Sequence, residues 1–403
     1  MIRDLIYKKK SWSIFMLSLA WVSFVFLRIL GEGFPKPPMI VFFLFVAVAF
    51  LSLKVVPCRI FKPLFIFLLY TLLGLMLLNP DPIFQSYSRL LYFFLLLLIV
   101  SPLIQKNNFR IFRESSFVLA LNYSIIIAII SMVCFFLGFN FAIRESEDAD
   151  TYLDNPNLFS GITNHSMTLG FVSMIAFVYV SHLAISSKKW SFVILAGLCF
   201  LTTIMSGSRA SILAGLISLI FLLFRSNNTS KMLLKRIIAI LTIVFLSFPF
   251  WSNFVERVML KQSTREVSGP FDSRTYKFKA RINEFEDSPL LGIGFSVVDP
   301  RYERLKKQGT IEPGSSWLGL LSMTGLIGFF IMFYVFVRAW RSVYRKRMYL
   351  HESLLLCLYV HMFVEGYIIS AGSIQCVILW TVIGACIDSE YDKSKKILVN
   401  GIN

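Results

Sequence analysis

The sequence predicts an all-α polytopic membrane protein with about 12 transmembrane helices and one long extracytoplasmic loop. Of the 403 residues, 56% are hydrophobic, 41 are Phe and only 16% are charged. The mean hydropathy is +0.70, which is too high for a water-soluble chain. The apolar residues also gather in windows of about 20, the length at which a helix crosses a bilayer.

Twelve windows have this length or close to it, and one long polar segment interrupts them. The windows fall near 12–30, 38–56, 61–79, 89–105, 117–139, 165–186, 190–206, 209–224, 236–252, 315–338, 350–370 and 372–388. We expect 1–403 to form a single membrane domain, with an outer loop at 253–314 between the ninth and tenth spans. No convincing cleavage site follows the first window, so we interpret it as an uncleaved span.

The positions of the charges predict the orientation. The net charge is +17, and most of the 40 Lys and Arg residues lie in segments that are intracellular if the N-terminus is inside. Most of the others fall in the long loop, and long loops are exempt from the positive-inside rule. Both termini are therefore predicted to be cytoplasmic, and any chemistry is expected on the outer face. The composition does not favour nucleic-acid binding.

The cysteines and acidic residues predict neither a metal site nor a disulfide framework. All six cysteines lie in or beside apolar windows, and none has CxxC spacing or a nearby histidine. Such cysteines are typical of apolar packing.

The motif Ser206-Gly-Ser-Arg-Ala places Arg209 between two apolar windows. A guanidinium there is costly unless it pairs or reaches water. One interpretation is an interface arginine whose head reaches the solvent. The other is a fixed cation for a phosphate or pyrophosphate, which arginine can bind through two parallel hydrogen bonds.

The segment DSRTYKFKARINEF begins with N-cap candidates and continues with helical spacing. The predicted apolar stripe consists of Phe278, Ile282 and Phe285, and the polar face of Arg274, Lys277, Arg281 and Glu284. Such a helix lies along a membrane with its aromatic side down and its basic side toward lipid phosphates. It is either an ordinary interfacial helix, or one whose Arg274, with Arg281 beside it, binds a lipid-linked pyrophosphate.

Two further motifs end the polar segment. Pro289 to Phe295, PLLGIGF, predicts a turn folded against the membrane, because no strand precedes the glycines as a nucleotide fingerprint would require. Glu312-Pro-Gly-Ser-Ser-Trp opens the tenth span. Glu312 is either a general base or a carboxylate favoured by the positive end of the helix dipole.

Few polar side chains remain as candidates elsewhere. His165, in Asn164-His-Ser before the sixth span, is the only histidine placed with the outer polar groups, whereas His361 falls within a span. A lone histidine at a helix start is more often structural. Glu365 and Gln375, in the last two windows, are functional candidates because polar groups are costly inside a membrane.

Together these motifs resemble the O-antigen ligase and polymerase superfamily. The resemblance rests on SGSRA between spans, DSR in the long outer loop, then PLLGIGF and SMTGLIGFF, and it covers about 200–330. It implies a GT-C-like, inverting, metal-independent glycosyltransferase without a cofactor, acting on glycans carried by undecaprenyl pyrophosphate.

The resemblance also suggests roles for individual residues. Arg209 matches the arginine of the family's SR motif, and Arg274 matches the arginine that opens its loop helix, so both are implied to bind the pyrophosphate. Many members have a histidine where this chain has Glu312-Pro-Gly-Ser-Ser-Trp. We therefore hypothesise that Glu312 activates the acceptor hydroxyl and that His165 assists it or positions a sugar.

Three functions remain open on the sequence. The first is a polysaccharide polymerase, which joins lipid-linked repeat units, and the second is an O-antigen ligase, which transfers polymer to lipid A-core. The third is a flippase or another transporter, although the polar residues concentrate on one face rather than at mid-bilayer. The expected location is the bacterial inner membrane, with the active site on its outer face. Expected partners are undecaprenyl-pyrophosphate-linked oligosaccharide and membrane lipids, with a flippase and a chain-length regulator as further candidates.

Overall fold

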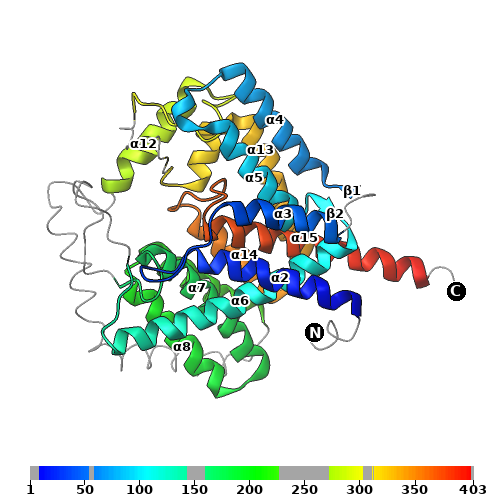
Figure 1. Ribbon diagram of the computed structural model, residues 1–403, viewed down its shortest axis with the longest axis vertical. Coiled ribbons are helices and arrows are strands. Elements are labelled where there is room, and N and C mark those ends of the chain that lie inside the picture. The colour runs from blue at the N-terminus through cyan, green and yellow to red at the C-terminus, as the bar shows by residue number, and fades with distance from the viewer. Residues whose placement is uncertain are drawn as a thin grey trace.

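The computed structural model describes residues 9–53, 59–142, 159–226, 272–302, 311 and 313–400, with only the backbone at 9–11, 272–274 and 391–400. Figure 1 shows a bundle of helices, which confirms the all-α prediction. The elements are α2 (Lys9–Leu27), α3 (Ile40–Leu53), β1 (Arg59–Ile60), α4 (Lys62–Leu78), η1 (Pro82–Phe84), α5 (Ser86–Val100), β2 (Ile104–Gln105), α6 (Asn107–Phe136), α7 (Ser166–Ser187), α8 (Trp190–Met205), α9 (Arg209–Arg225), α12 (Asp272–Asp287), α13 (Ser316–Tyr344), α14 (Tyr349–His361) and α15 (Ile374–Asn400). The two short strands pair antiparallel.

Among the described residues, four helical segments are long and apolar enough to cross a membrane: Pro82–Val100, Asn107–Phe136, Ser166–Ser187 and Ser316–Tyr344. Shorter apolar helices occupy Trp12–Leu27, Ile40–Leu53, Lys62–Leu78 and Trp190–Met205. Each expected window that the structure describes contains a helix, although the helix in the window at 350–370 ends early. The window at 236–252 lies outside the described residues, so the number of 12 spans stays a prediction.

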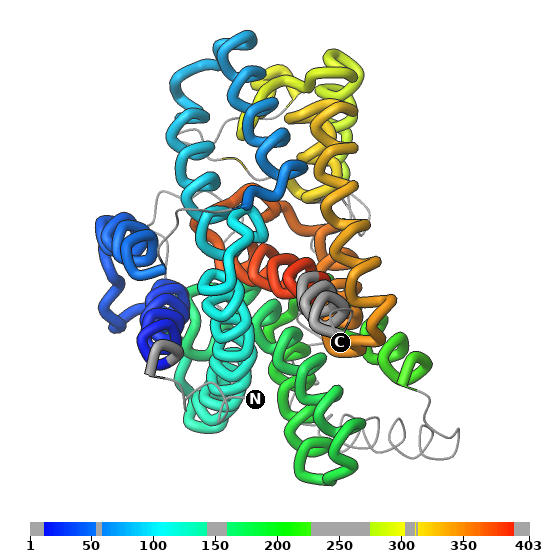
Figure 2. The backbone as a smooth tube through the Cα atoms, turned by 90° about the vertical axis from the view of Figure 1, so that its right-hand side faces the viewer, coloured from blue at the N-terminus to red at the C-terminus, as the bar shows by residue number. Residues whose placement is uncertain are grey.

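The bundle has two distinguishable ends. Helices α9 and α14 run antiparallel, because Ser211 contacts His361 at one end and Arg225 pairs with Glu352 at the other. We call the first the α12 end, and the second, where α2 begins and α15 finishes, the opposite end (Figure 1). In Figure 2, α15 (red) passes through the middle of the bundle. Its Trp380 is fully buried and donates to the carbonyl of Ile368 at 3.0 Å.

Helix α13 is broken at Gly325, where φ is 61° and ψ is −170°. The loop 289–294 occupies the break. Backbone hydrogen bonds join Leu326 N to Pro289 O at 2.8 Å, Ile293 N to Ser322 O at 2.9 Å and Gly294 N to Met323 O at 3.1 Å. The Tyr70 hydroxyl donates to Thr324 O at 2.8 Å. PLLGIGF therefore pairs with the backbone of α13, rather than only folding against the membrane as the sequence suggested.

Helix α14 is shorter than the window at 350–370 predicted, since it ends at His361. The chain beyond it receives the start of α13. Ser316 N donates to the carbonyls of Met362 at 2.9 Å and Glu365 at 3.0 Å, and Ser316 Oγ donates to Glu365 O at 2.7 Å. A continued helix would use these carbonyls internally. The interruption therefore connects α13 to the segment between α14 and α15.

Candidate functional site

The SGSR motif forms the turn between α8 and α9 at the α12 end. Gly207 adopts a left-handed φ of 68°, and Ser208 is the N-cap of α9. A Cβ added to Gly170 of α7 would lie 2.6 Å from both Ser206 Oγ and Ser208 Cβ. The turn is thus held closely against α7, which fixes the direction in which α9 starts.

Arg209 is the first residue of α9, and its side chain is exposed. Within the described part of the chain, no carboxylate pairs with it. The first turn of a helix also offers backbone N–H groups and the positive end of the helix dipole. Arg209 and the start of α9 together are suited to an anion such as a phosphate.

A buried chain of hydrogen bonds runs behind Arg209. Ser208 Oγ and Ser211 Oγ lie 2.8 Å apart, and Ser211 Oγ lies 3.2 Å from Nε2 of His361. The His361 ring also packs against Phe171 and Tyr367, with centroids 5.2 and 5.6 Å away. A histidine therefore lies behind the arginine motif.

The structure moves His361 from the interior of a predicted span to the end of α14. Sequence reasoning missed this position because the apolar run continues to residue 370 and gives no stop signal at 361. The signal that could have found it is Gly366, followed by the turn residues Ser370-Ala-Gly. These residues weaken the helical interpretation of that stretch.

His165 caps α7. Its Nδ1 accepts a hydrogen bond from Met167 N at 3.0 Å, so the neutral ring carries its proton on Nε2. In that tautomer the ring presents a donor, and it can accept a proton on Nδ1 only by giving up the cap. His165 is therefore better suited to holding a sugar hydroxyl than to removing a proton.

The start of α13 lies against α12. Gly314 has a φ of 74°, and a Cβ there would lie 3.1 Å from Lys277 Cβ. Pro313 packs on Gly366, where an added Cβ would lie 2.5 Å from the proline Cγ. Glu312 and the side chain of Arg274 lie outside the described residues. Pro313 is thus anchored on the chain beyond α14.

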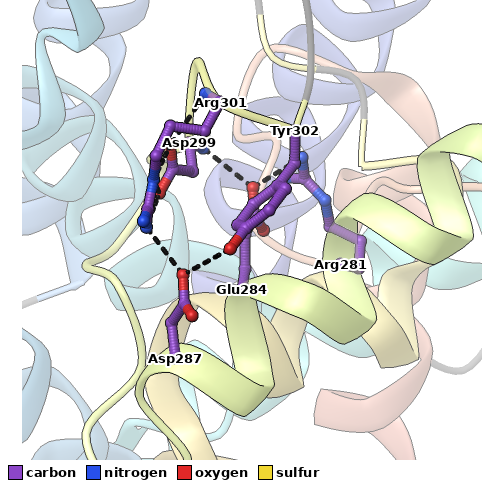
Figure 3. Close-up of polar contacts among 6 residues, drawn as sticks. All are labelled: Arg281, Glu284, Asp287, Asp299, Arg301 and Tyr302. Carbon is purple, nitrogen blue, oxygen red and sulfur yellow. Dashed lines mark hydrogen bonds and ion pairs between the residues drawn. The ribbon is translucent and has the colours of Figure 1, made fainter.

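The polar face of α12 points into the protein, which corrects the prediction that it faces lipid phosphates. Lys277, Arg281 and Glu284 are at most 7% exposed, whereas Ile282 of the apolar stripe is 44% exposed. In Figure 3, Arg281 and Glu284 lie side by side, and their Nη2 and Oε1 atoms are 2.8 Å apart. Glu284 Oε1 also accepts from Asp299 N at 2.8 Å. The buried pair therefore joins α12 to the turn after PLLGIGF.

A second group of charged residues, which are exposed, adds to the contact between α12 and the turn after PLLGIGF (Figure 3). Arg301 pairs with Asp299 and, at 2.6 Å, with Asp287, while the Tyr302 hydroxyl donates to Asp287 at 2.9 Å. The hydrogen bond from Arg301 lowers the pKa of Asp299. The hydrogen bond to Asp287 raises the pKa of Tyr302. Arg301 and Tyr302 thus join the turn at 299–302 to Asp287 of α12, which indicates a structural role for these charges.

The structure describes the side chains of three predicted site residues, Arg209, His165 and Arg281. The structure brings Arg209 to the α12 end, with His361 behind it and the start of α13 docked beside His361. His165 lies at the same end, at the start of α7. Arg281 is committed to Glu284 within α12.

Comparison with known families agrees with the motifs. Residues 194–333 match a family model described as O-antigen ligase. This range includes the SGSR turn, α12, PLLGIGF and the first half of α13. No match is found among curated proteins. Residues 194–333 are therefore similar to the O-antigen ligase family, in agreement with the resemblance that the motifs indicate.

Proposed function

We propose that the chain is a polysaccharide polymerase. It would transfer a glycan from undecaprenyl pyrophosphate to a lipid-linked repeat unit on the outer face of the cytoplasmic membrane. The observation that carries the donor side of the proposal is Arg209, exposed at the N-terminus of α9 inside the matched region, without a described carboxylate partner.

The donor side needs positive charge more than it needs covalent chemistry. Pyrophosphate is a good leaving group, so the main requirement is to stabilise the charge that develops on it. Arg209 and Arg274 are proposed to do this without a metal ion. Arg281 is the third candidate and has the least support, because Glu284 already neutralises it at 2.8 Å.

The acceptor side needs a base and a positioned hydroxyl for an inverting displacement. We assign Glu312 as the base and His165 as the group that positions the sugar. The assignment of Glu312 is supported by its neighbour Pro313, which packs beside the His361 end of α14. The assignment of His165 is supported by the tautomer that its cap requires.

An O-antigen ligase, which transfers finished polymer to lipid A-core, is the second candidate. It is favoured by the description of the matched family itself. Both reactions use the same donor, so the arginine site does not separate them. The acceptor separates them, because the acceptor of a polymerase is linked to lipid through pyrophosphate, whereas lipid A-core is not.

A deletion strain separates the two functions. Loss of a polymerase accumulates single lipid-linked repeat units, whereas loss of a ligase accumulates full-length lipid-linked polymer. Complementation with wild type or Lys62→Ala should restore the product, because Lys62 is exposed at the opposite end. Complementation with Glu312→Gln or Arg209→Ala should fail. Normal product from Glu312→Gln and His165→Ala combined would overturn the assigned acceptor side.

A further inference from the structure

A cavity of about 430 Å³ lies at the α12 end, between α2, α3, α5, α7 and α15. This volume falls within the ~300–1,000 Å³ typical of small-molecule sites. The polar residues in its lining are Arg28, Lys36, Asn164, Thr168, Ser373 and Gln375. The proposed function uses none of them.

Two cations line this cavity, and neither has an acidic partner among the residues that the structure describes. Arg28 donates from Nη1 to Met39 Sδ at 2.7 Å and lies 6.0 Å from the Phe24 ring, and Lys36 is exposed. No carboxylate pairs with either residue in the ranges that the structure describes. A sulfur atom and an aromatic ring are poor compensation for a guanidinium. The cavity therefore has an excess of positive charge suited to an anion.

Asn164, one of the lining residues, also carries a side-chain oxygen without a donor among the described residues. Asn164 N donates to Ile29 O at 2.7 Å, which fixes the backbone. Its Oδ1 is buried, and no hydrogen-bond donor reaches it from the described residues. Leaving such an atom unmatched is unfavourable, which favours a ligand that brings a hydroxyl donor to it. Thr168, Ser373 and Gln375 supply further polar groups for hydroxyls.

The cavity is close to the candidate site but separate from it. Tyr367 N and Ile368 N donate to Ser316 Oγ at the start of α13, whereas residues 371–377 line the cavity. Asn164 lines it too, and the next residue, His165, caps α7. The segment between α14 and α15, together with the start of α7, therefore divides the cavity from the Arg209 side.

We propose that this cavity binds the phosphate-bearing saccharide headgroup of a second lipid-linked substrate, through Arg28, Lys36 and Asn164. The inference rests on the proposed polymerase function. Such an enzyme holds two lipid-linked pyrophosphates at once, and Arg209 with Arg274 neutralises only one of them. The cavity supplies a second set of cations, together with acceptors and donors for sugar hydroxyls.

Binding stoichiometry tests this without any catalysis. The full chain in phosphatidylcholine nanodiscs would be titrated with geranylgeranyl pyrophosphate, and the bound equivalents counted. Wild type should bind two equivalents. Arg28→Ala and Lys36→Glu should each weaken one of them at least about tenfold, as expected when a bond to a charged group is lost. Arg209→Ala should weaken the other equivalent, and Lys62→Ala should leave both unchanged.

Two binding results would contradict the second site. One equivalent in wild type, or two unaltered equivalents in Lys36→Glu, would overturn the proposal. Because Lys36 is exposed, that variant stays informative even if Arg28→Ala fails to fold.

Inorganic pyrophosphate should compete for both equivalents. Equal competition by phosphatidylglycerol would show a general headgroup site and overturn the proposal. Two equivalents together with no polymer formation would instead reject the polymerase function and leave the second site in place.

Discussion

The arginines at the two ends of the bundle differ in their carboxylate partners. At the opposite end, Arg113 forms bonds of 2.6 and 2.8 Å to Asp388 and is fully buried, and Arg225 pairs with Glu352 at 3.0 Å. The α12 end has paired arginines too, namely Arg281 and Arg301. It differs in also having Arg28 and Arg209, which have no carboxylate partner among the described residues. A neutralised arginine fixes helices, whereas one without a counter-charge can bind an external anion. The contrast indicates which cations are structural and which are available for substrate.

The largest effect is expected when the Arg113–Asp388 pair is broken. Arg113→Ala should lower the free energy of unfolding by about 3–5 kcal/mol, because it leaves a buried carboxylate without its partner. Thermal unfolding of the purified protein would measure this. The double variant Arg113→Met with Asp388→Leu should recover most of the loss. A single variant as stable as wild type would contradict the structural role.

The next effect should be catalytic rather than structural. Arg209→Ala should reduce polymer formation about 10²–10³-fold, the loss typical when a group that stabilises developing charge is removed. The melting temperature should stay within about 1 °C of wild type, because the side chain is exposed and packs against little. Arg209→Lys should retain part of the activity. A large drop in stability with normal activity per folded molecule would reverse the contrast between the two ends.

A third prediction concerns the break in α13, which binds the loop that follows α12. Gly325→Ala should destabilise the protein by about 1–3 kcal/mol, because φ is 61° and the new Cβ would clash with the Leu290 carbonyl. Gly74→Ala is the matched control, since an added Cβ there meets open space. It should be neutral or slightly stabilising. Equal stability of the two variants would show that the α13 break is dispensable.

The smallest effect should come from the exposed charges of Figure 3. The pKa of Asp299 is lowered by Arg301, so its contribution is present above the unfolded value of about 3.9 and is lost as the pH falls below it. The hydrogen-exchange protection factors of residues 288–302, which are corrected for the pH dependence of intrinsic exchange, should be constant from pH 7 to 5 and fall below about pH 4. The change should correspond to at most about 1 kcal/mol. Arg301→Ala should remove the pH dependence.

The sequence predicted the helices well and their environment less well. Apolar windows and caps located α7, α9, α12 and α13, because these signals are local. The burial of Lys277, Arg281 and Glu284 was not predictable, since a helical stripe does not tell which neighbour it meets. The early end of α14 depends on Ser316, 45 residues earlier in the chain than His361. Such long-range hydrogen bonds leave no local pattern.

Part of the candidate site was also accessible from sequence. Arg209 stood out because a lone arginine between apolar windows is unusual, and its position at the α12 end agrees with that expectation. His361 and the cavity lined by Arg28 and Lys36 did not stand out. Their residues come from different helices, and only the packing of α2, α7 and α15 brings the cavity lining together.

The pairing of loop 289–294 with the break in α13 has a consequence for chimeric proteins. The segment between α9 and α13 looks like an independent unit that could be exchanged between relatives by cutting before α13. The backbone partners of its loop 289–294, however, lie at Ser322, Met323 and Leu326, inside α13. A transplanted loop would meet a foreign helix break with a different register. Exchange should succeed only when the loop and the paired part of α13 are transferred together, with the downstream junction placed beyond Ile327.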